Sequence, residues 1–186
     1  DGSIVAWGSN AMGQCSVAPL PVGARYASAA AGFWHSIAIR GDGSVVGWGL
    51  NHIGQATAPP LPSGVTYVRI SAGVDFSLAL RSDGSVVAWG DNQYGQRLVP
   101  SLPPGERYVE VAAGWWYAMA LRSDGQVVAW GDNSVGQRDV PVLPSGLRYT
   151  TIAAGLQHSL RIDFQATNPP GLGLANPDDA LSLIHI

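Results

Sequence analysis

The sequence DGSIVAWGSNAMGQ at residues 1–14 returns as DGSVVGWGLNHIGQ at 42–55, DGSVVAWGDNQYGQ at 83–96 and DGQVVAWGDNSVGQ at 124–137. The four copies start 41 residues apart, without an insertion or deletion. A strict period of this length is typical of repeat architectures and predicts the fold before any local pattern does. Positions that are identical in all copies are expected to be scaffold, and positions that vary are candidates for function.

A single repeat predicts four short strands. In the third copy we expect them at Tyr108–Ala113, Tyr117–Arg122, Val127–Gly131 and Gln137–Val140, with Pro141 ending the last one. The Asp124-Gly125 pair predicts a tight hairpin turn, because glycine tolerates the positive φ that such turns need. The apolar runs are nearly continuous, which favours sheets covered on both faces. We therefore predict an all-β fold, a β-propeller of four-stranded blades with four blades present.

Matched positions in the copies predict how the blades pack. The first strand of each blade ends in Ala-Gly, which suits a crowded axis. The recurring tryptophans are expected to be wedges between adjacent sheets: Trp7, Trp48, Trp89 and Trp130. On the innermost strand, Arg69 and Glu110 occupy one matched position on neighbouring blades, which predicts an ion pair near the central channel.

The motifs DGxVVxWGxNxxGQ, LPxGxxY and AAGxxHSLAL resemble the repeats of the regulator of chromosome condensation family, over about residues 1–163. The short repeats look more like those of bacterial members than those of the nuclear exchange factor, and they are similar to those of the propeller-type β-lactamase inhibitory protein. The resemblance implies a β-propeller, typically with seven blades. Four copies are therefore interpreted as an arc of a larger ring, with closure of four blades on themselves as the alternative. An arc would leave open strand edges available for self-association.

The ends of the chain differ from the repeats. The propeller repeats are assigned to residues 1–163, and residues 164–186 are interpreted as a Pro- and Gly-rich linker or tail. Its last residues, Leu181–Ile186, resemble translated sequencing-adapter sequence and are treated as a candidate non-native ending. The chain starts inside a repeat, which indicates a processed or truncated N-terminus and a fragment of a longer protein. No motif determines where in or outside the cell the protein is found, and an extracellular or secreted location is favoured.

Composition and motifs argue against several function classes. The net charge is −3 and no lysine is present, which disfavours nucleic acid and anionic membranes as partners. No apolar run is long enough to span a membrane. The sequence has no phosphate-binding loop, no metal-ligand spacing and no acid/base pair. We therefore expect no cofactor, no metal, no catalytic residue and no enzymatic activity.

Function is expected where the copies diverge, on the face formed by two loop classes. Tryptophans outside the wedge positions all fall in the loop after the Ala-Gly: Trp34, Trp115 and Trp116. Candidate partner-binding residues in the two loop classes are Trp34, Asp75, Trp116 and Gln157, and His52, Asp91, Gln93 and Tyr94. Packing is the alternative for the tryptophans, and turn capping is the alternative for Asp91.

The favoured function is a protein–protein interaction module that binds a partner, such as an enzyme to be inhibited, through this aromatic loop face. Two alternatives stay open. One is a regulatory propeller that resembles a guanine-nucleotide-exchange factor. The other is an architectural repeat module of a larger secreted protein.

Overall fold

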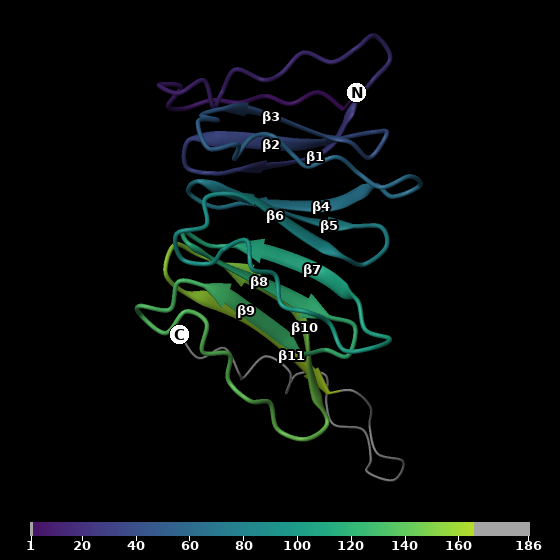
Figure 1. Cartoon of the computed structure of the whole chain (residues 1–186), viewed down its shortest axis with the longest axis vertical. Helices are drawn as coiled ribbons and strands as arrows, with labels where there is room; N and C mark the ends of the chain where they lie inside the picture. The colour runs from purple at the N-terminus through teal and green to yellow at the C-terminus, as the bar shows by residue number, and fades with distance from the viewer. Residues whose placement is uncertain (1, 166–186) are drawn as a thin grey trace, which may run out of the picture.

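The computed structural model describes residues 2–165 as a series of short antiparallel strands, and no helix lies within these residues. Figure 1 shows the strands as a stack of sheets that follow one another along the chain. The strands are β1 (Tyr26–Ala31), β2 (His35–Arg40), β3 (Val45–Gly49), β4 (Tyr67–Ala72), β5 (Phe76–Arg81), β6 (Val86–Gly90), β7 (Tyr108–Ala113), β8 (Tyr117–Arg122), β9 (Val127–Gly131), β10 (Leu147–Ala154) and β11 (Ser159–Gln165).

The sheets have the orders β1-β2-β3, β4-β5-β6 and β7-β8-β9, and β10 pairs with β11. Three of the strands predicted in the third copy, β7, β8 and β9, form with the predicted bounds. The predicted Asp-Gly turn forms as well. Gly125 has a φ of 81°, and the backbone N–H of Gln126 donates a 3.0 Å hydrogen bond to Asp124 Oδ1. The repeat is therefore an all-β unit, as predicted.

The predicted fourth strand, Gln137–Val140, does not form, so the sheets have three strands and not four. Gln137 and Arg138 lie in a turn, and the Gln137 side chain holds that turn by accepting a 3.1 Å hydrogen bond from the Val135 N–H. Pro141, which follows, has no N–H to donate to a neighbouring strand. The apolar residues of this segment therefore pack as an extended connection.

The two ends of the repeat series are incomplete sheets. Residues 4–8 match β3, β6 and β9 in sequence, but they form no strand. Among the described residues, β10 and β11 pair only with each other. Figure 1 shows the first repeat at one end of the stack and β11 at the other. Residues 2–165 therefore form an open stack, in which the first repeat and β11 do not meet in a composite sheet.

A tyrosine and a tryptophan of each repeat pack in the core between consecutive sheets. Tyr67 and Trp89 are buried with their ring centroids 6.3 Å apart. The Tyr67 hydroxyl donates a 2.7 Å hydrogen bond to the Pro59 carbonyl, which fastens the Leu-Pro connection to the next sheet. Trp48 and Trp130 are buried at the equivalent positions. The predicted tryptophan wedge is confirmed at these three positions.

The wedge prediction is wrong for Trp7, which is 84% exposed. The other three tryptophans lie on a third strand that pairs with a second strand, for example Trp130 opposite Ala118. Trp7 has no such strand beside it within the described residues. Its burial therefore depends on a sheet that this stack does not provide.

The predicted ion pair between Arg69 and Glu110 is also wrong. No ion pair joins these two described residues; the pair that the structure shows is between Arg122 and Asp124, at an Asp-Gly turn. Glu110 instead accepts hydrogen bonds from the Thr151 hydroxyl at 3.1 Å and from the Ile152 N–H at 3.2 Å. Both of its carboxylate oxygens are thus bound by neutral donors of the following sheet.

Candidate functional site

The two loop classes that were assigned to one face do lie side by side. In each three-stranded sheet, the residue after the third strand donates a backbone hydrogen bond to the loop between the first two strands. The bonds are Leu50 N to Trp34 O at 2.8 Å, Asp91 N to Asp75 O at 2.8 Å and Asp132 N to Trp116 O at 2.9 Å. The variable positions of both classes therefore share one edge of the stack.

Backbone hydrogen bonds also join the loops of neighbouring sheets into a row. Val74 N donates to Trp115 O, and Trp115 N donates to Leu156 O, each at 3.2 Å. The glycine of the Ala-Gly pair permits this approach. A Cβ atom on Gly73 would lie 2.6 Å from the Gly114 carbonyl oxygen and 2.2 Å from Phe76 Cε1. The row is therefore a close-packed platform for the side chains that it carries.

Five aromatic rings on this platform, Phe33, Trp34, Trp115, Trp116 and Tyr94, form a continuous series, which we call the aromatic ridge. Neighbouring ring centroids along it are 4.6, 6.4, 5.0 and 5.5 Å apart, in the order Trp34, Phe33, Trp115, Trp116, Tyr94. Phe33 is 50% exposed and Tyr94 is 47% exposed. The ridge brings the predicted residues Trp34, Trp116 and Tyr94 into one surface.

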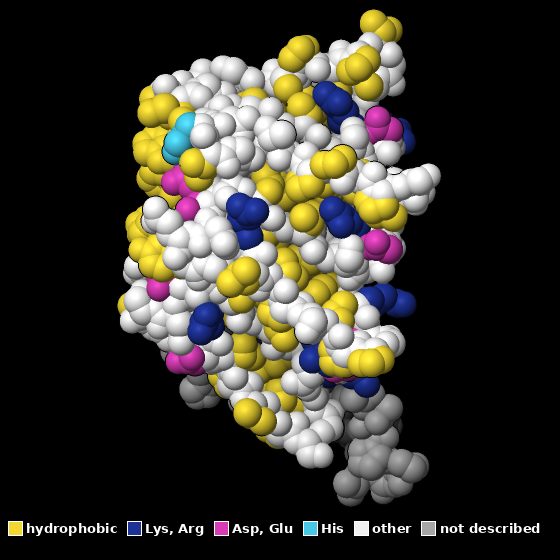
Figure 2. Space-filling model, in the orientation of Figure 1, with side chains coloured by type: hydrophobic (Ala, Val, Ile, Leu, Met, Phe, Trp, Pro, Cys, Tyr) yellow, Lys and Arg dark blue, Asp and Glu magenta, His cyan; other side chains and the backbone are white. Residues whose placement is uncertain are grey.

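The two edges of the stack differ in chemistry. Figure 2 shows apolar side chains gathered along one edge, with some acidic side chains among them, and Arg side chains alternating with acidic ones along the other edge. At the Asp-Gly turns, Arg122 pairs with Asp124, and a hydrogen bond from the Ser44 hydroxyl lowers the pKa of Asp42. The charged edge is thus internally paired at these turns, which leaves the ridge edge as the candidate site.

The predicted residues Asp75 and Asp91 each accept a hydrogen bond from a buried glutamine. Gln96 Nε2 donates to Asp91 Oδ2 at 2.9 Å within one turn. Gln55 Nε2 donates to Asp75 Oδ1 at 3.2 Å, and this bond joins the turn after β3 to the loop between β4 and β5 of the next sheet. Both carboxylates therefore have a structural role, in addition to any contact with a partner.

Asp75 accepts the glutamine hydrogen bond that, in the two following copies, an aspartate of the same turn accepts. Asp91 and Asp132 follow β6 and β9, but Leu50 follows β3. Gln55 therefore has no carboxylate in its own turn, and Asp75 supplies one from the next sheet. The buried glutamines are the part of the site that sequence reasoning missed, although Gln14, Gln55, Gln96 and Gln137 recur in all four copies.

We predict that Asp75→Ala lowers the free energy of unfolding by about 1–3 kcal/mol, because it leaves the buried Gln55 amide without its carboxylate acceptor. Adding Leu50→Asp should restore most of the loss, since Asp132 meets Gln137 in the same way at 2.8 Å. Urea unfolding followed by circular dichroism measures both variants. Gln157→Ala, at the matched exposed position, is the control and should have little effect. If Asp75→Ala lowers the free energy of unfolding equally with and without Leu50→Asp, the stabilising role of the Gln55–Asp75 hydrogen bond would be contradicted.

The remaining predicted residues lie around the ridge. His52 and Gln93 are exposed, and the His52 ring lies 3.4 Å from Gln55 Nε2. The Gln93 N–H donates to Asp91 Oδ1 at 3.2 Å. Gln157 is exposed beside β11, where it lines a separate pocket. The structure thus groups most of the predicted residues but places Gln157 at the far end of the row.

A hollow of about 310 Å³ lies between the Ala-Gly ends of the sheets and the rings of Phe33 and Trp115. Its lining contains no titratable side chain. Among residues 2–165, no group of three or more His, Cys, Asp or Glu side chains is placed to hold a metal ion. None of the described segments is a helix with the length and apolar character needed to cross a membrane.

The fold and the paired loops define a repeat protein of the β-propeller class. The Regulator of chromosome condensation (RCC1) repeat matches at residues 26–55, 67–96 and 108–137. The repeats of this chain therefore belong to the RCC1 repeat family. A comparison with curated proteins found no match.

Solved structures support this assignment. Prp20p from Saccharomyces cerevisiae is similar with a TM-score of 0.68 at 25% identity, over 84% of this chain and 50% of that chain. Yeast RCC1 (Prp20) bound to Kap60 gives a TM-score of 0.68 at 24% identity, over 84% and 49%. The CRINKLY WD40 ectodomain of the Arabidopsis thaliana receptor kinase ACR4 is similar in fold, with a TM-score of 0.59 at 23% identity over 77% and 51%. The chain thus spans about half the length of these structures.

Proposed function

We propose that this chain is part of a protein-binding propeller and that the aromatic ridge contacts the partner protein. The observation that carries the proposal is the unbroken series of five rings across the loops of the three complete sheets. Tryptophan and tyrosine are enriched among the residues that dominate protein–protein binding energies, because they bury large areas and keep a polar atom for a hydrogen bond.

The surroundings of the ridge suit a binding surface. Asp91, Gln93 and His52 supply polar groups beside the rings, as in the rim of a protein interface. The hollow beside Phe33 and Trp115 is apolar and lacks the acid, base or nucleophile that catalysis would need. These features support binding as the role of the face.

The structural relatives are consistent with this role. Prp20p has binding properties toward Gsp1p and histones, and yeast RCC1 is found bound to Kap60. Because the chain covers about half of these proteins, we propose that its repeats are an arc of a larger ring, of the seven-bladed type that the family resemblance implies. A partner would then contact the ridge on the face of the propeller that these loops form.

We predict that Trp34→Ala and Trp116→Ala each weaken partner binding at least about tenfold without a comparable loss of stability. Wild-type and variant chains are used as bait in quantitative affinity capture, and the affinity of each captured partner is then measured by titration calorimetry. A panel of β-lactamases is the first set of defined partners to assay, given the resemblance to the propeller-type inhibitory protein. Val22→Ala and Val142→Ala, which are exposed in the Leu-Pro connections, are matched controls.

Two outcomes would contradict this proposal. In the first, both tryptophan variants unfold at much lower urea concentrations, which would make the rings core residues. In the second, binding survives both variants, which would move the contact to another face. Faster nucleotide release from a small GTPase in the presence of the chain would favour the exchange-factor alternative.

A further inference from the structure

Trp48 and Trp130 each occupy a socket formed with the preceding repeat, whereas the Nε1 of Trp89 is buried without a hydrogen-bond partner. Trp130 Nε1 donates a 2.7 Å hydrogen bond to the Gln96 carbonyl, and Trp48 Nε1 donates a 2.8 Å hydrogen bond to the Gln14 carbonyl. In the sheet register, the three tryptophans lie opposite matched residues of the second strand. These pairs are Trp48 with Ser36, Trp89 with Ser77 and Trp130 with Ala118.

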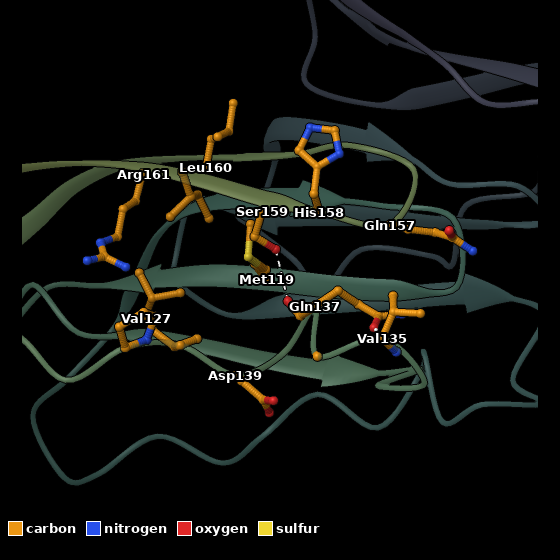
Figure 3. A pocket seen from close by; sticks show the side chains of 14 residues that line it. Met119, Val127, Val135, Gln137, Asp139, Gln157, His158, Ser159, Leu160 and Arg161 are labelled. Carbon is orange, nitrogen blue, oxygen red and sulfur yellow. Dashed lines mark hydrogen bonds between the residues drawn. The ribbon is translucent and has the colours of Figure 1, made fainter. Parts of the chain in front are cut away.

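The next position in this series is a socket without a tryptophan. It is the pocket of about 300 Å³ between the turn after β9 and β11, shown in Figure 3. Its lining includes Gln137 and Ser159, the counterparts of Gln96 and Ala118, with Met119, Val127 and Ile152 as apolar residues. The Ser159 hydroxyl donates to the Gln137 carbonyl at 2.9 Å, as the Ser36 hydroxyl does to the Gln14 carbonyl at 2.9 Å. The pocket therefore has the carbonyl partner that the sockets of Trp48 and Trp130 offer to an indole.

The strand that would fill such a socket is present at the other end of the chain. Residues 4–8 read IVAWG, against VVGWG in β3 and VVAWG in β6 and β9. Ile4 packs against the core of the first sheet, but Val5 and Trp7 are exposed. One face of this segment is therefore held in place while the other presents an unused tryptophan.

We propose that residues 4–8 of a second copy of this chain add to the open edge of β11 and place Trp7 in the pocket. The register of the complete sheets puts Trp7 opposite Ser159, Ala6 opposite Leu160 and Ile4 opposite Ile162. Leu160 and Ile162 are exposed on the edge strand and would be covered. Strand addition supplies backbone hydrogen bonds, and the indole supplies specificity.

A second copy fits better than another part of the same chain. Figure 1 places the first repeat and β11 at opposite ends of the stack, so one chain does not bring its own Trp7 to its own pocket. Residues 166–186 contain no Phe, Trp or Tyr. The contact joins two different surfaces, so it is head-to-tail and gives either a closed ring or a longer array.

Light scattering and sedimentation of the 186-residue chain over a wide range of concentration test the proposal. The wild-type chain should associate, and Trp7→Ala should associate at least about tenfold more weakly. Ser159→Lys, which fills the pocket with a charged side chain, should have the same effect. It should not prevent folding, because Ser159 is exposed and Ala118 occupies the matched position without a hydroxyl. Val142→Ala is the control and should behave as wild type.

Mixing distinguishes a head-to-tail contact from other modes of association. Trp7→Ala keeps the pocket and Ser159→Lys keeps the tryptophan, so the two together should form a one-to-one complex that neither forms alone. A wild-type chain that stays monomeric, or whose association is unchanged by Trp7→Ala, would overturn the proposal. Association that appears only after removal of residues 166–186 would place the chain's own end in the pocket and would also overturn it.

Discussion

Trp130→Ala is expected to lower the free energy of unfolding by about 3–5 kcal/mol, the usual cost of removing a large buried aromatic side chain. Trp130 is 5% exposed and packs in one cluster with Phe76, Leu78 and Tyr108. Its truncation leaves a cavity between two sheets and removes the hydrogen bond to the Gln96 carbonyl. Urea unfolding followed by far-ultraviolet circular dichroism measures the loss without relying on tryptophan fluorescence.

Trp7→Ala is the matched control for this prediction. It removes the same side chain from the same repeat position, but Trp7 is 84% exposed. At a concentration low enough to keep the chain monomeric, its effect should be within about 0.5 kcal/mol of zero. Similar losses in the two variants would mean that Trp7 is packed as the other tryptophans are, and that the stack is closed in solution.

The internal repeat predicted the strands that depend on local signals. The bounds of β7, β8 and β9 follow from apolar runs that end at glycine or at an Asp-Gly turn, which any single copy shows. The predicted fourth strand failed because a buried glutamine side chain holds the turn in that segment. Trp7 failed for a different reason, since its burial requires another sheet beside it. A repeat pattern describes each unit and its expected neighbours, but it does not tell which neighbours are present.

The candidate site was predictable to the extent that it follows from comparing the copies. Trp34 and Trp116 stood out because they occupy a variable position in one loop class. The ring contacts of Phe33 and Trp115 depend on the distance between sheets, which the sequence alone does not contain. The bond from Gln55 to Asp75 crosses from one sheet to the next, so it becomes visible only when Leu50 and Asp75 are considered together.

Acid is expected to destabilise the chain through His35, by up to about 3 kcal/mol between neutral pH and pH 4. His35 is fully buried, and its Nε2 lies 2.8 Å from the Ser77 hydroxyl, which itself donates to the Gln55 carbonyl. Because that hydroxyl proton is already committed, Nε2 carries the hydrogen, and a second proton would have to enter at Nδ1. Burial lowers the pKa of His35 to about 4, and its Nδ1 is buried without a hydrogen-bond partner that would stabilise the added proton.

The sign follows from proton uptake in the two states. The unfolded chain binds a proton at His35 near pH 6.5 and the folded chain near pH 4, so the unfolded state holds more protons between these values. Stability is therefore complete above pH 6.5 and falls as the pH approaches 4. Urea unfolding of the wild-type chain at a series of pH values measures this slope.

His35→Phe isolates the contribution of this side chain. Phe76 occupies the matched position in the next sheet, so a phenyl ring fits the repeat, and Ser77 keeps its bond to the Gln55 carbonyl. The variant should lose the part of the slope between pH 6.5 and 4 that His35 causes. His158→Phe changes the matched but exposed position and should retain it. If His35→Phe keeps the full wild-type slope, His35 is accessible to protons in the folded chain, and the packing between the first two sheets is looser than the buried ring implies.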